Sequence, residues 1–119
     1  MKITHKKIKL KTLDHVVYVV FAKSIKKGYK YVEKEFKIWA EVDLSKIDGL
    51  TISLSDKSSI VLLKNDDYLY NHSVIVHELS HVWRNILTGI SVDVQVNEEI
   101  EAYAKQYLYT VIRKYLRKL

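Results

Sequence analysis

The sequence predicts a small α+β domain, with strands in its first half and two helices in its second half. Apolar and polar residues alternate with a period of two in the first half, whereas from about residue 71 the period lies between three and four. The glycines at positions 28, 49 and 89 separate the periodic runs. We expect a single domain over residues 1–119, in which a small antiparallel sheet of about three or four strands precedes two main helices.

Strands are predicted for four apolar runs: Val16–Ala22, Phe36–Asp43, Leu50–Ser55 and Ile60–Leu63. The first run is rich in β-branched and aromatic residues, which suits a buried strand, and the next two alternate as half-buried antiparallel strands do. The fourth is either a short strand or the lead into the following helix. Lys26–Tyr29, which includes a glycine, predicts a reversal of the chain, and Asp48-Gly49 predicts a turn.

Two amphipathic helices are predicted after residue 70. The first begins at a suitable N-cap residue, Asn71, His72 or Ser73, and ends near Thr88, where Gly89 provides a stop. Its apolar stripe is so wide that we expect burial on most sides: Ile75, Val76, Leu79, Val82, Trp83, Ile86 and Leu87. The second opens at Asn97, ends in a basic turn, and has this predicted apolar face: Ile100, Tyr103, Ala104, Tyr107, Leu108, Val111, Ile112, Tyr115 and Leu119.

Composition excludes several classes of protein. The chain has no cysteine, so disulfide scaffolds, thiolate metal sites and cysteine nucleophiles are excluded, and any metal must be bound by His, Asp or Glu. The longest apolar run, Val16–Ala22, is far shorter than the roughly 20 residues of a membrane span. The lysine-rich start also lacks the apolar core and cleavage site of a signal peptide. We therefore expect a soluble, cytoplasmic protein that does not enter a membrane.

Positive charge is concentrated near the start of the chain. The formal net charge is +6, and eleven of the lysines lie in the first 37 residues. Unpaired lysines on one face create a positive potential that attracts nucleic acid, an anionic membrane or an acidic partner. A solvated lysine-rich face without a partner gives the same pattern. Nucleic acid is therefore a candidate partner of the lysine-rich half.

The first helix contains the sequence His77-Glu78-Leu79-Ser80-His81, which is an HExxH motif. Residues four apart lie one above the other on a helix, so both imidazoles are able to bind one ion, and Glu78 projects beside that ion. With five His and seven Glu in 119 residues, the probability of a chance HExxH is roughly 1%. Burying these three side chains in an apolar helix is costly unless they are paired or bind a metal. The motif predicts zinc held by His77 and His81.

The start of the second helix offers three carboxylates for a third zinc ligand: Glu98, Glu99 and Glu101. A helix-face count places Glu101 nearest the apolar stripe. Glu99 lies three residues before the small Ala102, which would allow the helices to approach closely. From the residue pattern alone, all three glutamates stay open.

HExxH followed by Asn97-Glu98-x-hydrophobic resembles the gluzincin metallopeptidases, typified by thermolysin, whose third zinc ligand is the Glu after that Asn. The resemblance implies Glu98 as the third ligand, Glu101 as a partner of a ligand histidine, and Glu99 facing solvent. Apolar residues after Glu98 support this pattern: Ile100, Tyr103, Ala104 and Tyr107. Residues 37–110 are similar to small HExxH proteins of phages and other mobile elements, which implies a minimal zinc-peptidase core. The separate helical domain of large gluzincins has no counterpart here, so the residue that stabilises the oxyanion is not placed.

The other histidines, at positions 5, 15 and 72, have no partner at ligand spacing, so we expect structural or surface roles for them. His72 lies near the start of the helix and is a candidate for the wall of the cleft. Tyr103 and Tyr107 are expected to be core aromatics rather than acid catalysts. Arg84 is a candidate for stabilising an oxyanion or binding a substrate carboxylate, and a solvated or salt-bridged role accounts for it equally well.

These residues predict a zinc-dependent metallopeptidase, in which a water activated by zinc attacks the peptide bond and Glu78 is the general base. The substrate is expected to be a peptide or protein that adds as an extended strand beside Leu50–Ser55. The alternative is a nucleic-acid-binding or other interaction module of a virus or mobile element with a structural zinc site. A non-peptide amide substrate and the oligomeric state are left open by the sequence.

Overall fold

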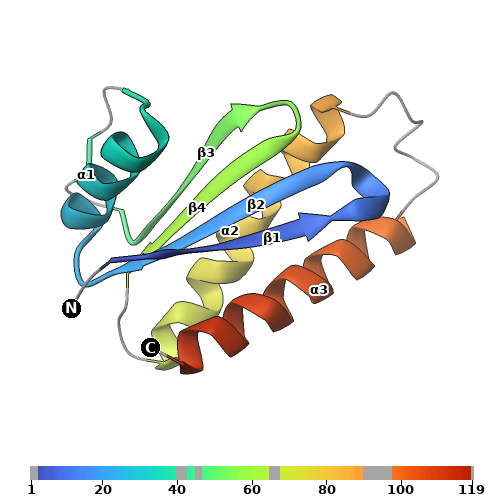
Figure 1. Ribbon diagram of the computed structural model, residues 1–119. Coiled ribbons are helices and arrows are strands. Elements are labelled where there is room, and N and C mark those ends of the chain that lie inside the picture. Colours follow the sequence, from blue (N-terminus) through green and yellow to red (C-terminus); the bar gives the residue numbers. More distant parts are fainter. Residues whose placement is uncertain (1–2, 40–42, 45–46, 65–67, 90–97, 119) are drawn as a thin grey trace.

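The computed structural model confirms a small α+β fold (Figure 1). Its described residues form a four-stranded sheet and three α-helices, one helix more than predicted. It describes residues 3–39, 43–44, 47–64, 68–89 and 98–118, and within these ranges the side chains of residues 12, 68–71, 89 and 98–99 are not described. In chain order, the elements are β1 (His5–Leu10), a 3-10 turn (Lys11–Leu13), β2 (His15–Ala22), α1 (Ile25–Phe36), β3 (Gly49–Ser55), β4 (Ser58–Lys64), α2 (Tyr68–Gly89) and α3 (Glu98–Arg117).

The sheet is mixed, with the strand order β1-β2-β4-β3. β1 pairs with β2, and β3 with β4, in antiparallel fashion, but the two central strands β2 and β4 are parallel. The prediction of a wholly antiparallel sheet is therefore wrong at its centre. Parallel neighbours require a crossover connection, and the chain makes this crossover through α1 and β3 before it returns as β4.

Helix α1 lies where the sequence predicted a reversal at Lys26–Tyr29. The side chain of Ser24 caps its first turn by accepting a hydrogen bond from the backbone N–H of Lys27 at 3.2 Å. Gly28 lies where α1 closely approaches the sheet. A Cβ there would lie 3.0 Å from the Cβ of Ala22 and would also meet the buried side chain of Leu62. The prediction failed because the glycine that signalled a turn instead lets the helix pack closely on the sheet.

The predicted strand Phe36–Asp43 is also wrong over the part that the structure describes. Phe36 is the last residue of α1, and Lys37 takes the left-handed conformation that ends the helix, with φ of 52°. Lys37–Trp39 and Asp43 have no strand structure, and residues 40–42 lie outside the described part. The sequence did not predict β1, because lysine occupies its solvent-facing positions while Ile8 and Leu10 are buried.

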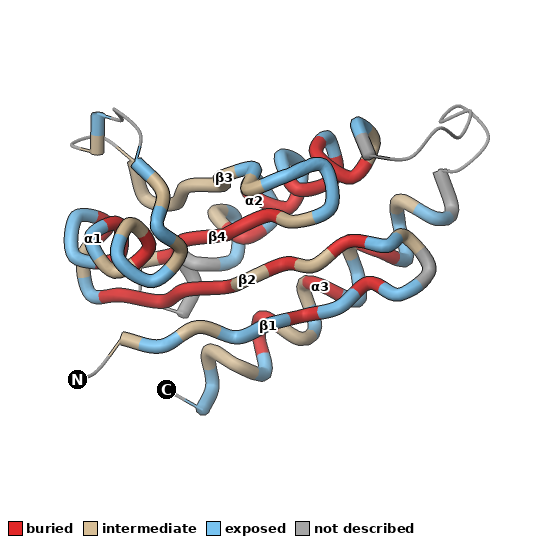
Figure 2. The backbone as a smooth tube through the Cα atoms, turned by 45° about the horizontal axis from the view of Figure 1, so that its top comes forward, coloured by how far each residue is buried: buried red, intermediate tan, exposed pale blue. Residues whose placement is uncertain are grey.

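Helices α2 and α3 cover one face of the sheet, and α1 covers part of the other (Figures 1 and 2). The predicted stripe of α2 is buried at Ile75, Leu79, Val82, Trp83 and Ile86, whereas Val76 is exposed. On α3, the buried residues are Ala104, Leu108 and Ile112, while Ile100, Tyr103 and Tyr107 of the predicted apolar face are exposed. The predicted apolar face of α3 was wider than the face that is buried, because a single stripe of residues packs α3 against α2 and the sheet. In the described part of the chain, none of the helices combines the length and apolarity needed to cross a bilayer.

Candidate metal centre

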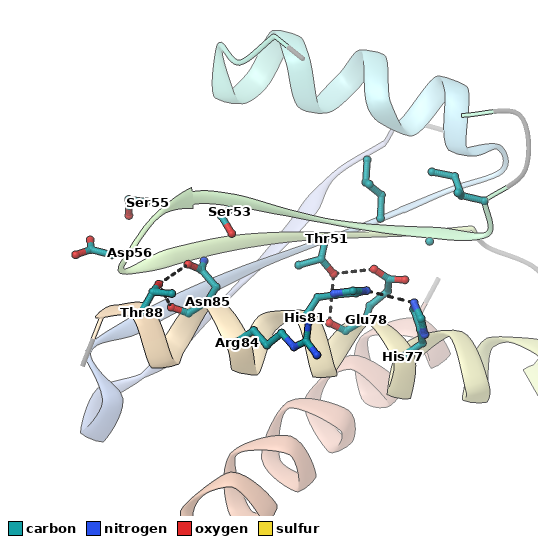
Figure 3. A pocket seen from close by; sticks show the side chains of 13 residues that line it. Thr51, Ser53, Ser55, Asp56, His77, Glu78, His81, Arg84, Asn85 and Thr88 are labelled. Carbon is teal, nitrogen blue, oxygen red and sulfur yellow. Dashed lines mark hydrogen bonds between the residues drawn. The ribbon is translucent and has the colours of Figure 1, made fainter. Parts of the chain in front are cut away.

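His77 and His81 lie one helical turn apart on α2 and direct their imidazoles toward each other (Figure 3). The two Nε2 atoms are 3.2 Å apart, and the ring planes cross at 76°. Two nitrogen ligands at about 2.0–2.1 Å from a tetrahedral zinc ion are separated by roughly 3.3 Å. The pair therefore fits two corners of a zinc site, although the same separation also allows one ring to donate a hydrogen bond to the other.

The two histidines are exposed, whereas Glu78 between them in sequence is only 5% exposed. The expectation that both imidazoles are buried in an apolar helix is therefore wrong. The reason is that α2 packs on the sheet through its Leu79 side, and the turn with the histidines borders a groove. Because the imidazoles are exposed, burial does not require them to bind a metal, and it is their convergence that favours a metal site.

Glu78 is held in place by strand β3. The Thr51 hydroxyl donates a hydrogen bond to Glu78 Oε1 at 2.7 Å and lies 3.2 Å from the Glu78 carbonyl oxygen (Figure 3). Gly49 lets the strand lie this close, because a Cβ at that position would be 3.1 Å from Glu78 Cγ and 3.2 Å from Oε2. Sequence reasoning missed Thr51, although its place on the polar face of a predicted strand was a usable signal. The carboxylate is thus fixed beside the histidine pair.

A groove of about 750 Å³ runs between β3 and α2 and contains the three motif residues. Thr51, Ser53 and Ser55 line it from the strand, and His77, His81, Arg84 and Thr88 line it from the helix. A second hollow of about 460 Å³ shares Gly49, His77 and Glu78 and extends toward Asp48 and Ser73. β3 is an edge strand of the sheet, so the groove follows a strand whose outer side pairs with none of the strands in the described residues.

A buried polar network ties α2 to the sheet at the far end of this groove. Asn85 Nδ2 donates hydrogen bonds to the Ser59 hydroxyl at 2.7 Å and to the Ser58 carbonyl oxygen at 3.0 Å. Ser59 Oγ in turn lies 2.8 Å from Nε2 of His15, which is 2% exposed. Burial lowers the pKa of His15, against the opposing influence of a hydrogen bond to the backbone of Asp56 and of nearby carboxylates. His15 is therefore a structural residue that fixes α2 relative to β2 and β4.

The predicted third ligand falls at the start of α3. Glu98 is the first residue of that helix, and the side chains of Glu98 and Glu99 lie outside the described part. The Glu101 carboxylate forms an ion pair with Lys105 at 3.0 Å. Among the side chains that the structure describes, no cluster of three or more His, Asp or Glu is placed to hold a metal ion. Glu98 stays the predicted third ligand, with Glu99 and Glu101 as alternatives.

The remaining candidates lie in other parts of the molecule. His5 packs against Tyr31 and Phe36 on the face that α1 covers, with its Nδ1 2.8 Å from the Tyr31 hydroxyl. His72 bonds through Nδ1 to the hydroxyl of Tyr109 on α3. Tyr103 and Tyr107 are exposed beside Lys9 and Lys11, where they line a separate hollow. Of the lesser candidates, it is Arg84 that lines the groove of the motif.

No family model, curated protein or solved structure matches this chain. The resemblance to gluzincins therefore stays a prediction that depends on the motif residues and their spacing. What bears on function is the geometry of His77, Glu78 and His81 in a groove beside a sheet edge.

Proposed function

We propose that this chain is a zinc-dependent peptidase. The observation that carries the proposal is the convergence of the His77 and His81 Nε2 atoms at 3.2 Å, next to the buried carboxylate of Glu78. His77 and His81 would hold the metal, together with Glu98 as the third ligand. When bound there, zinc would supply a Lewis acid that polarises the scissile carbonyl and makes water acidic enough to act at neutral pH.

Glu78 moves the protons in this reaction. Its carboxylate takes one proton from the attacking water, so that the water oxygen bonds to the carbonyl carbon of the scissile amide. The same carboxyl group then gives that proton to the amide nitrogen as the carbon–nitrogen bond breaks, and a free amine and a free acid result. Thr51 engages Oε1 and holds the carboxylate against β3, so we assign the proton transfer to Oε2.

The exposed edge of β3 binds the substrate in this proposal. An extended peptide pairs its backbone with that edge and places its scissile bond over the histidine pair. The hydroxyl groups of Thr51, Ser53 and Ser55 line the groove below such a peptide. They impose no charge preference, so main-chain hydrogen bonding accounts for most of the affinity.

The test of this function begins with metal content. The purified chain is expected to contain about one zinc per molecule by elemental mass spectrometry, in keeping with a single site. His77→Ala and His81→Ala are expected to lose this zinc, because two ligands cannot hold it against a chelator. His72→Ala is the matched control, since His72 is exposed on the same helix but bonds to Tyr109.

Cleavage of a peptide library by the zinc-loaded chain is the second part of the test. Hydrolysis that disappears in both His variants and persists in His72→Ala supports a peptidase. A chain that takes up no zinc even after reconstitution with excess metal would contradict the proposal.

A second candidate function is contact with nucleic acid through the lysines of β1, α1 and their flanks. Ten lysines of this region are exposed: Lys6, Lys7, Lys9, Lys11, Lys23, Lys26, Lys27, Lys30, Lys34 and Lys37. Among the described residues, none of them forms an ion pair, and Asp14, an acidic residue of the same region, pairs with Lys57. The lysines on α1 lie across the sheet from the groove, so both functions are compatible in one chain.

Nucleic-acid contact predicts a steep salt dependence. If about four phosphates are neutralised, the affinity for labelled DNA or RNA should fall roughly a hundredfold between about 50 and 200 mM salt. Fluorescence anisotropy measures this effect, with Lys26→Gln and Lys30→Gln weakening binding and Lys105→Gln, which removes a lysine already paired with Glu101, as the control. Absence of binding at low salt would remove this candidate.

A further inference from the structure

Arg84 supplies the positive charge of the groove. It is exposed on α2 three residues after His81, and it is the only lysine or arginine among the described residues that line the groove. In the described part of the chain, no carboxylate forms an ion pair with it. Figure 3 shows its guanidinium group near His81, on the open side of the helix. A cation in this position is available to a bound molecule.

The fold sets the relative direction of β3 and α2, and with it the side of Arg84 for a peptide that pairs antiparallel with β3. Gly49, at the start of β3, lies against Val74 and Glu78, whereas Ser58, just after the end of β3, accepts a hydrogen bond from Asn85. The strand and the helix therefore run in the same direction. A peptide that pairs antiparallel with β3 has its N-terminal part toward Ser55 and its C-terminal part toward Gly49. Arg84 then lies on the N-terminal side of the scissile bond.

The spacing limits which substrate residues reach Arg84. Three residues of α-helix advance by about 4.5 Å from His81. Helical side chains lean toward the helix N-terminus, which brings the guanidinium back toward the histidine pair. One residue of extended peptide spans about 3.3 Å. Together these lengths bring the Arg84 guanidinium within reach of the first two peptide residues before the scissile bond.

We propose that Arg84 determines specificity by binding the carboxylate of an Asp or Glu at one of the first two positions N-terminal to the scissile bond. This inference rests on the proposed peptidase function and names its substrate class. Arginine suits the role because its planar guanidinium donates two parallel hydrogen bonds to a carboxylate. The opposite wall carries the neutral hydroxyls of β3 and, after Ser55, the acidic residue Asp56, so a substrate carboxylate in this groove is attracted by Arg84 alone among the described lysines and arginines.

Binding to the inactive Glu78→Gln protein tests the inference without cleavage. Fluorescein-labelled octapeptides that carry Glu, Gln or Lys at each position in turn are titrated against the zinc-loaded variant by fluorescence anisotropy. Glu at one of the two positions is expected to bind roughly tenfold more tightly than Gln, in line with a charge-assisted hydrogen bond. Adding Arg84→Gln should abolish this difference, and adding Arg84→Glu should reverse it in favour of Lys. Lys114→Glu on α3, an exposed residue outside the groove, is the control for net charge.

The same peptides, cleaved by the protein with Glu78 intact, give the ratio of kcat/KM for Glu and Gln substrates. That ratio should fall to about one in Arg84→Gln, while thermal melts stay unchanged because Arg84 is exposed. Normal cleavage with the Glu preference intact in Arg84→Gln overturns the role of Arg84 and leaves the peptidase function standing. A preference on the C-terminal side of the scissile bond overturns the peptide direction. A zinc-loaded protein that neither binds nor cleaves any peptide overturns the proposed function and this inference with it.

Discussion

Replacing Glu78 with glutamine is expected to lower kcat/KM for peptide hydrolysis by about 10²- to 10⁴-fold, the usual contribution of general acid–base catalysis. Glutamine keeps the shape of the side chain and still accepts the hydrogen bond from Thr51, but it cannot take up a proton from water. Zinc content should stay at the level of the unaltered chain, because Glu78 is not a ligand in this scheme. Steady-state kinetics on a cleaved library peptide, with parallel metal analysis, measure both quantities.

Glu33→Gln on α1 is the matched control, since it removes the same charge on the opposite side of the sheet. A Thr51→Val variant should lose less activity than Glu78→Gln, because the carboxylate stays present but is held less firmly. Full activity in Glu78→Gln would show that hydrolysis, if present, does not use this carboxylate. A loss of zinc along with activity would show instead that Glu78 takes part in binding the metal.

Replacing Glu98 with alanine is the second change with a large expected effect. We expect zinc affinity to fall by more than about a hundredfold, since losing a residue that only supports a ligand already costs 10- to 100-fold. Glu99→Ala and Glu101→Ala are the matched variants on the same helix turn. Both should bind zinc well, because the Glu101 carboxylate pairs with Lys105 and not with a histidine as the gluzincin resemblance implied. Glu101→Ala also removes the ion pair with Lys105, but a solvent-accessible ion pair of this kind contributes little to the stability of the fold. Competition with a chromophoric chelator measures the affinities.

A large loss in Glu99→Ala or Glu101→Ala, with Glu98→Ala unaffected, would transfer the third-ligand role to that residue. The gluzincin-like spacing of the Asn-Glu sequence would then be coincidental. Equal, small effects in all three variants would mean that the third ligand comes from another part of the chain. In each case the His77 and His81 variants define the level at which binding is lost.

Helices α2 and α3 were easier to predict than the sheet and α1, for reasons visible in particular residues. On α2, Ile75, Leu79, Val82 and Ile86 repeat at helical spacing, and all four are buried as that spacing requires. In the first half, lysine fills the outward positions of β1, and only Ile8 and Leu10 are apolar and buried. Two apolar residues were too few to predict a strand from the sequence. Gly28 suggested a turn, yet its use is to bring α1 close to the sheet, which local sequence does not reveal.

The sequence by itself determined the chemistry of the candidate site. The four-residue spacing of His77 and His81 brings both imidazoles to one side of a helix whatever the helix packs against, and the structure places their Nε2 atoms 3.2 Å apart. No long-range contact is needed to bring the two histidines together, since their arrangement follows from helix geometry alone.

The tertiary structure decided what surrounds that chemistry. Only the mixed sheet, with β3 at its edge, brings Gly49 and Thr51 against Glu78 and turns one side of α2 into the wall of a groove. The sequence already made Arg84 a candidate for binding a substrate carboxylate, but its place on the wall of the groove depends on a strand that is about thirty residues away in sequence. Contacts between residues so far apart depend on strand order and helix packing, which the local periodicity of a sequence does not specify.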